Sequence, residues 1–149
     1  MHVVRTAVSG DVPRCTELLE ILFSQEHEFT ANAEVQSRAL DMIICNPGLG
    51  RIFVCEIDGV IEGMVMLLFT VSTFLGKQVA LLEDMVVATE WRQKGLGSLL
   101  INHSMEFARK EGLGRVTLLT DGDNESAQQF YQSKGFSKSE MVVFRKQID

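Results

Sequence analysis

The sequence has few cysteines and lacks an apolar run long enough to cross a bilayer. Cys15, Cys45 and Cys55 are an odd number at wide spacing, without a Cys-x-x-Cys pair, so free thiols in a reducing cytoplasm are favoured over a disulfide framework. A membrane-spanning helix needs about 20 apolar residues in succession, and the first residues lack the charged and apolar regions of a signal peptide. We therefore expect a cytoplasmic protein with no membrane contact and no metal.

Positive charge is also scarce. The chain has 14 Lys and Arg residues against 20 Asp and Glu residues, a formal net charge of −6. A nucleic-acid surface requires clustered Lys and Arg, so we expect no nucleic-acid partner. The surplus of carboxylates is compatible with a cationic or amine substrate, but it is also ordinary solubilising surface. Net charge thus leaves the substrate open.

The length and the order of elements predict one domain over residues 1–149. A chain of 149 residues can bury a single core, and it contains no repeat, low-complexity tract or linker. Hydrophobic periodicity and turn residues predict strands at 3–7, 51–57, 60–71, 78–87, 115–120 and 140–145, and helices from about 11 to 23 and at 33–44, 96–110 and 125–134. This order indicates an α/β (α+β) fold, a mixed sheet with helices on both faces. His103 is expected to be a partly buried helix residue.

One glycine-containing turn carries most of the chemical information. A strand ending near Val87 leads into Arg92-x-x-Gly95-x-Gly97, and an amphipathic helix follows. Glycines let the backbone approach a ligand closely, and a helix start offers unpaired N–H groups and the positive end of its dipole. Arg92 and Lys94 add positive charge. The turn is therefore a candidate phosphate site, although a plain turn into a helix would look the same in isolation.

A second block follows about thirty residues later, Asn124-x-x-Ala127-x-x-Phe130-Tyr131-x-x-x-Gly135-Phe136. In this order and spacing, the two blocks resemble the acyl-CoA loop and the following helix of the GCN5-related N-acetyltransferase (GNAT) family. The resemblance covers nearly the whole chain. Two positions differ from many relatives, since Gln93 stands in place of Gly and Thr89 in place of Pro, but neither change removes a phosphate-facing glycine.

The resemblance implies a fold and a co-substrate. It implies a central sheet splayed between the fourth and fifth strands, here 78–87 and 115–120, with acetyl-CoA entering at the splay. Backbone groups of Met85 and Val87 would bind the pantetheine arm, and Asn124 would bond the cofactor while also serving as a helix N-cap. The pyrophosphate would lie on the loop and the first helical turn, at Arg92, Gln93, Lys94, Gly95, Gly97 and Ser98.

Two residues are candidates for acid–base catalysis. Tyr131, the only tyrosine, matches the general acid that protonates the leaving thiolate in relatives; a purely packing role is the alternative. Leu82-Glu83-Asp84 resembles the Leu-Glu-Asp of polyamine acetyltransferases, whose glutamate helps to deprotonate the amine through water. A structural salt bridge is the alternative for Glu83. Strand alternation predicts Glu83, Met85 and Val87 on one face, unless a bulge intervenes.

The acceptor site is less defined. Glu26, Glu28 and Asp84 are candidate acceptor-binding residues, with an exposed polar loop as the alternative for 25–29. The reaction implied is direct attack of a primary amine on acetyl-CoA in a ternary complex, with a small polyamine-like acceptor favoured. Peptide acetylation and a non-catalytic acyl-CoA-binding module are the alternatives. A homodimer could form through the predicted strand 140–145.

Overall fold

The computed structural model describes residues 1–25 and 32–149, which form two compact units, Met1–Leu119 and Thr120–Asp149. The first unit holds most of the secondary structure: β1 His2–Thr6, a 3-10 turn Ser9–Asp11, α1 Val12–Ser24, α2 Ala33–Ile44, β2 Gly50–Ile57, β3 Val60–Ser72, β4 Lys77–Val87, a 3-10 turn Thr89–Trp91, α3 Leu96–Lys110 and β5 Val116–Leu118. The second unit holds α4 Glu125–Ser133. None of the helices in the described ranges is long and apolar enough to span a membrane.

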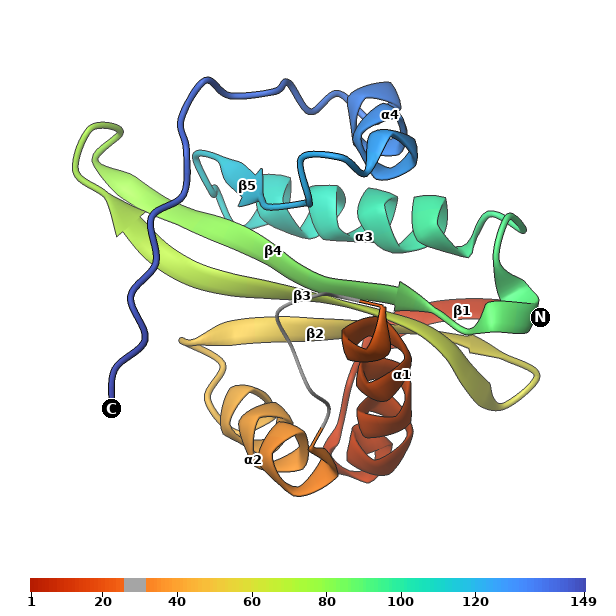
Figure 1. The fold of residues 1–149 in the computed structure, drawn as a ribbon. Coiled ribbons are helices and arrows are strands. Elements are labelled where there is room, and N and C mark those ends of the chain that lie inside the picture. The colour runs from red at the N-terminus through yellow and green to blue at the C-terminus, as the bar shows by residue number, and fades with distance from the viewer. Residues whose placement is uncertain (26–31) are drawn as a thin grey trace. The chain divides into compact units, whose positions relative to one another are not determined.

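The first unit is built on a five-stranded sheet with the order β1-β2-β3-β4-β5 (Figure 1). Neighbouring strands are antiparallel from β1 to β4, and β5 is parallel to β4. Asp58 and Gly59 join β2 to β3 with positive φ angles of 49° and 84°, as a type I′ hairpin turn requires. The mixed sheet predicted from the sequence is therefore confirmed.

Helices cover both faces of this sheet (Figure 1). On one face, α1 and α2 pack on alternate residues of the central strands, including Val54, Met64 and Met66. On the other face, Phe53 contacts Phe107 of α3 at 5.3 Å between ring centroids. The ring of His103 also lies on Phe53, at 4.7 Å, and burial lowers its pKa. His103 is thus a half-buried helix residue, as expected.

An ion pair joins the first strand to the turn before α1. The Arg5 guanidinium donates to both carboxylate oxygens of Asp11, at 2.8 and 3.1 Å, and the Val8 N–H donates to the same carboxylate at 2.8 Å. The Arg5 hydrogen bond is the main cause that holds the pKa of Asp11 below its usual value. Because a bidentate charged pair fixes orientation as well as charge, this contact sets where α1 starts.

Two strand predictions differ from the structure. Residues 140–145 do not form a strand, and β5 spans only Val116–Leu118 of the predicted range 115–120. The apolar pattern of these segments is correct for strands, but a strand exists only when its backbone pairs with a neighbour. Periodicity in the sequence indicates the apolar pattern of a strand, but it does not indicate whether the backbone has a strand to pair with.

Candidate active site

The pairing between β4 and β5 ends at Leu82. β4 pairs with β5 only over Ala80–Leu82, opposite Val116–Leu118, and then continues to Val87 without a β5 partner in the described chain. A strand edge of this kind can bind an extended ligand through main-chain hydrogen bonds, as an added strand would. This is the splay that the resemblance predicts between the fourth and fifth strands.

A β-bulge interrupts β4 within the splayed stretch. Met66 of β3 lies opposite Glu83, whereas Met64 lies opposite Val86, so two residues of β4 face one residue of β3. Asp84 is at the bulge and adopts a left-handed conformation with φ of 52°. Aspartate tolerates this conformation better than most side chains do. The bulge bends the strand where its outer edge becomes open.

The bulge changes which side chains share a face. Glu83 and Val86 both lie on the side of the sheet that α1 and α2 cover, because their partners Met66 and Met64 belong to that core. Val87 instead lies opposite Gly63, whose missing Cβ would contact Leu100 of α3.

Glu83 and Val87 therefore do not share a face, because the bulge allowed for in the sequence inserts a residue and shifts the period by one. The Glu83 side chain itself is exposed.

The segment after β4 turns sharply into α3. Thr89–Trp91 forms a 3-10 turn, and Gln93 and Gly95 then adopt left-handed conformations with φ of 61° and 89°. Gly95 caps the helix and has no Cβ to oppose this angle. Gln93 carries a Cβ at such an angle, so a glutamine at this position has a conformational cost that a glycine would not have.

The same turn presents a run of unpaired donors. In the described part of the chain, no backbone N–H from Gln93 to Ser98 donates to a protein acceptor. A Cβ built on Gly95 would meet nothing within 4 Å, so the space outside the turn is open. Arg92 and Lys94 are exposed beside it, and the Lys94 ammonium lies 5.0 Å from the centroid of the Trp91 ring. Unpaired amides, a helix dipole and two cations suit a phosphate group.

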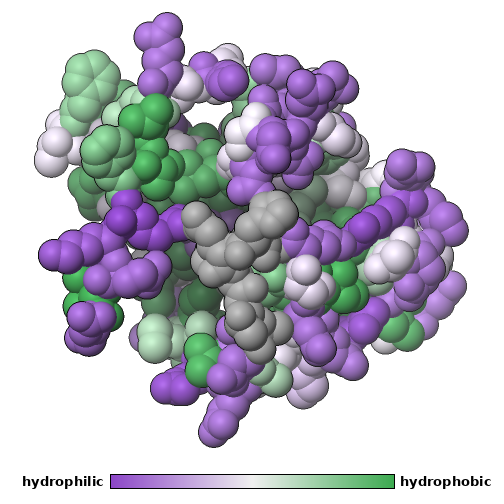
Figure 2. Space-filling model, in the orientation of Figure 1, coloured by the Kyte–Doolittle hydropathy of each residue, from purple (hydrophilic) through white to green (hydrophobic). Residues whose placement is uncertain are grey.

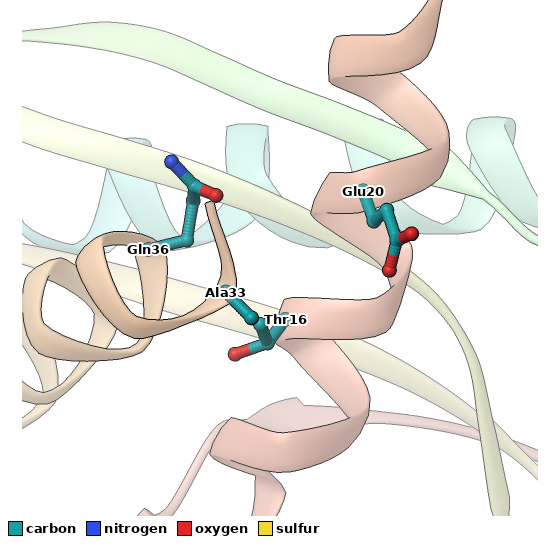
Figure 3. A pocket seen from close by; sticks show the side chains of 4 residues that line it. All are labelled: Thr16, Glu20, Ala33 and Gln36. Atoms are coloured by element: carbon teal, nitrogen blue, oxygen red, sulfur yellow. The ribbon is translucent and has the colours of Figure 1, made fainter. Parts of the chain in front are cut away.

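A small hollow lies between α1 and α2 in the first unit (Figure 3). Thr16 and Glu20 line it from α1, and Ala33 and Gln36 line it from α2. Its volume of about 120 Å³ is below the range of roughly 300 Å³ and upward that is usual for ligand pockets. The hollow is therefore too small to hold an acceptor by itself.

The second unit carries the other predicted residues. Asn124 is the N-cap of α4, where its side-chain oxygen accepts a hydrogen bond of 3.1 Å from the Ala127 N–H. The Tyr131 ring packs against Phe130 and Phe136, with centroid distances of 5.3 and 5.8 Å. Burial raises the pKa of Tyr131, so the phenol remains protonated at neutral pH.

The predicted residues fall into three groups. The first unit brings Glu83 through Val87 and the turn 92–98 into one continuous segment, and the second unit holds Asn124 and Tyr131. Glu26 and Glu28 lie outside the described residues. The sequence did not predict the contact of Trp91, whose ring lies under the Lys94 ammonium. An aromatic residue three positions before a lysine is too common a pattern to indicate such a contact.

Known proteins share these features. A model of the acetyltransferase (GNAT) family matches residues 14–136. An uncharacterized N-acetyltransferase of Methanocaldococcus jannaschii is 34% identical over 91 residues, which cover 60% of this chain and 40% of that protein. The L-ornithine N5-acetyltransferase of Arabidopsis thaliana is 35% identical over 78 residues, covering 52% of this chain and 34% of that enzyme. The matched regions thus span less than half the length of these two relatives.

A solved structure matches over the whole chain. The crystal structure of a protein from Clostridium difficile 630 superposes with a TM-score of 0.90 and covers 100% of this chain and 99% of that chain. At 15% identity, this similarity supports the fold alone. Because the family model spans most of the sequence, both the splayed strands and the turn at Gly95 fall within it. The chain belongs to the GNAT acetyltransferase family.

Proposed function

We propose that this protein is an N-acetyltransferase that moves an acetyl group from acetyl-CoA to the primary amine of a small molecule. The observation that carries the proposal is the run of unpaired N–H groups from Gln93 to Ser98, which continues from a strand whose outer edge is open. Family membership supports acetyl-CoA as the molecule that these donors bind. The thioester supplies an acetyl group that is already activated for attack.

The binding roles follow from the backbone. The pyrophosphate accepts hydrogen bonds at the turn and the first turn of α3, from the residues Arg92, Gln93, Lys94, Gly95, Gly97 and Ser98. The pantetheine arm lies along the outer edge of β4, where the main chain of Met85 and Val87 bonds it as a neighbouring strand would. Asn124 adds a contact to the cofactor while it caps α4. Holding the thioester in one pose converts a bimolecular encounter into a positioned reaction.

Two side chains handle protons in the proposed reaction. The amine must be neutral to attack, and Glu83, whose side chain is exposed at the bulge, accepts its proton through a water molecule. The amine nitrogen forms a bond to the acetyl carbon while the carbon–sulfur bond breaks, and the electron pair of that bond leaves on sulfur. Tyr131 donates its phenolic proton to this thiolate, the new amide nitrogen releases its surplus proton to water, and the tyrosinate takes a proton back from water. No acyl-enzyme forms, because both reactants are held together.

Polyamine-like compounds are the favoured acceptors. Leu82-Glu83-Asp84 resembles the motif of polyamine acetyltransferases, and one relative is an L-ornithine N5-acetyltransferase, which acts on a small amine. Glu26, Glu28 and Asp84 would bind the cationic part of such an acceptor. Peptide acetylation is the second candidate, and a non-catalytic acyl-CoA-binding module is the third. The presence of both Glu83 and Tyr131 favours an enzyme over such a module.

The domain organisation and the cellular location of the protein belong to the same proposal. We propose that residues 1–149 act as one acetyltransferase domain, since the family model at 14–136 extends across both compact units. We also propose a cytoplasmic location, where acetyl-CoA and reduced thiols coexist. Cys15 and Cys55 are buried thiols, and a reducing compartment would keep such thiols unpaired.

A thiol-release assay across acceptors tests the proposal. Purified protein and acetyl-CoA are mixed with polyamines, basic amino acids, aminoglycosides or peptides, and free CoA is measured over time. Turnover with polyamines or ornithine-like amines, above the rate without acceptor, is the expected result. Turnover with peptides and with none of the small amines would show that the acceptor is a peptide and not a polyamine-like compound. Tight acetyl-CoA binding by calorimetry without release with any amine would instead indicate a binding module.

A further inference from the structure

A buried ion pair joins α1 to the start of β3. The Arg14 guanidinium donates to the Glu62 carboxylate at 2.9 Å and to the Ile61 carbonyl at 2.8 Å. Hydrophilic side chains cover much of the face shown in Figure 2, but only 9% of the Glu62 side chain is exposed. Because a carboxylate taken out of water is costly unless it is paired, Arg14 is what allows Glu62 to be buried here.

A bulge places Glu62 at this position. Ile61 of β3 lies opposite Glu56 of β2, and Gly63 lies opposite Cys55. Glu62 between them is therefore an extra residue that has no partner in β2. A bulge re-aims both the side chain and the carbonyl of the inserted residue, so Glu62 can bond elements other than β2.

Arg14 restrains the backbone at this bulge. Its guanidinium is planar and presents its N–H groups as a rigid fork. One of these groups bonds the carbonyl before Glu62, and another bonds the Glu62 carboxylate. The two contacts hold the preceding peptide and the side chain, so they restrict the backbone that carries the Glu62 carbonyl. The remaining nitrogen lies 3.5 Å from the exposed carboxylate of Glu17, a contact within α1 that involves no strand.

The Glu62 carbonyl in turn holds the chain where it leaves the sheet. It accepts a hydrogen bond of 2.7 Å from the Ala88 N–H, one residue past the end of β4. The Ala88 carbonyl then accepts from the Trp91 N–H at 2.9 Å, inside the 3-10 turn. Among the described residues, Ala88 is the last before α3 whose backbone N–H donates to another element. Its bond to Glu62 therefore anchors the donor-rich turn of residues 93–98 to the sheet.

We propose that Arg14 and Glu62 are positioning residues for acetyl-CoA binding, which hold the donor-rich turn in the orientation that receives the pyrophosphate. They act through the Glu62 carbonyl, which bonds Ala88 ahead of the turn. Amides that already point at a ligand bind it more tightly, because ordering the loop then costs little free energy. This role rests on the proposed function, since acetyl-CoA is taken as the ligand of the turn. An ion pair that only docked α1 on the sheet would stabilise the fold and leave the affinity unchanged.

Two variants test the pair through acetyl-CoA affinity, measured by calorimetry well below Tm. Glu62→Gln keeps the shape of the side chain and removes its charge, and Arg14→Lys keeps the charge but loses the fork that bonds two acceptors. Each should raise the Kd for acetyl-CoA about tenfold. The KM for acetyl-CoA should rise in parallel, while kcat at saturating acetyl-CoA stays within about twofold, because the loss is in binding. Glu17→Gln removes the exposed partner of the same guanidinium and should bind as the wild type does.

Trp91 reports on the turn without any ligand. It is the only tryptophan in the chain, and its ring packs on the core. In Glu62→Gln and Arg14→Lys, a displaced turn should expose this ring and move its fluorescence emission to longer wavelength. Amide exchange at Ala88 should also accelerate more than exchange at Val54, in the centre of β2, because the change is local.

A wild type that does not bind acetyl-CoA would overturn this role together with the proposed function. If the wild type binds acetyl-CoA and both variants have the same Kd, the role alone is wrong. A lower Tm with unchanged Kd and unchanged Trp91 emission has the same meaning, since the pair would then only stabilise the fold. An equal loss of affinity in Glu17→Gln would also contradict the role, because the effect would then come from net charge.

Discussion

Tyr131 combines two properties that a leaving-group acid needs. Its ring is fixed between Phe130 and Phe136, and burial raises the pKa of its hydroxyl, so the proton is retained as pH rises. Tyr131→Phe should lower kcat by about 100-fold, a typical value for loss of a general acid. Its Kd for acetyl-CoA, measured by calorimetry, should stay unchanged.

Phe130→Leu is the matched control for this variant. It loosens the packing beside Tyr131 without removing the hydroxyl. It should therefore lower Tm while kcat stays close to that of the wild type. Equal turnover of Tyr131→Phe and wild type with a good acceptor would exclude the acid role.

Glu83 is assigned the proton of the attacking amine. Glu83→Gln keeps the shape of the side chain and removes its charge, so the rise of kcat/KM with pH on the acidic side of the profile should flatten. The rate at neutral pH should fall by about 100-fold. Glu111→Gln, at the exposed C-terminal end of α3, alters the net charge by the same amount and should leave the pH profile unaltered. Superimposable pH profiles of Glu83→Gln and wild type would rule out this base.

At the scale of elements, the junction of β4 and α3 depends on the backbone angle at Gly95. With φ of 89°, an alanine at this position is strained by about 1 kcal/mol, although its methyl group has open space. Gly95→Ala should therefore lower Tm slightly and weaken acetyl-CoA binding by about tenfold, because relief of the strain moves the N–H groups.

Gly48→Ala offers the comparison for Gly95. A Cβ there also meets nothing within 4 Å, and its φ is not in the left-handed range, so both Tm and affinity should be close to wild type. An acetyl-CoA Kd for Gly95→Ala equal to that of Gly48→Ala would show that the turn does not hold the cofactor.

The stability of the whole molecule should depend on pH through Asp11. Its carboxylate is only 10% exposed and is held by Arg5, and its pKa in the folded state lies below the ordinary value of 3.8. A lowered pKa in the folded state stabilises the protein above pH 3.8, and this contribution is lost as pH falls through the folded-state pKa. Asp11→Asn should lower the free energy of unfolding by about 2 kcal/mol at pH 7.

Urea denaturation at pH 7, 4 and 2.5 measures this effect. The gap between Asp11→Asn and wild type should be widest at pH 7 and should narrow at pH 2.5, below the ordinary pKa of 3.8, because the unfolded state then binds a proton that the folded state holds less readily. Asp41→Asn, on an exposed position of α2, should show little gap at any pH. A gap for Asp11→Asn that stays constant down to pH 2.5 would argue against the ion pair as its source.

Much of the fold follows from local pattern. The sequence predicts α2 at its observed bounds, the hairpin at Asp58-Gly59, and α3 from residue 96 to 110, because amphipathic spacing, turn residues and glycine preferences act over a few residues. The donor-rich turn at Gly95 is predictable for the same reason, since Gly95 needs no distant contact to adopt its angle.

Other features depend on partners that are far apart in the chain. Which face Glu83 occupies is decided by a bulge that exists only where β3 and β4 align, and no local pattern marks the extra residue. The extent of β5 depends on how far β4 stays beside it, and residues 140–145 form no strand in the described chain although their apolar pattern suits one.

The sequence by itself determined the family, the helices and the donor-rich turn at Gly95, because these depend on residues close together in the chain. Only the tertiary structure decided that the predicted splay begins after Leu82 and which side of the sheet carries Glu83. Those features arise from backbone pairing between distant strands, whose register is fixed by packing on both faces of the sheet.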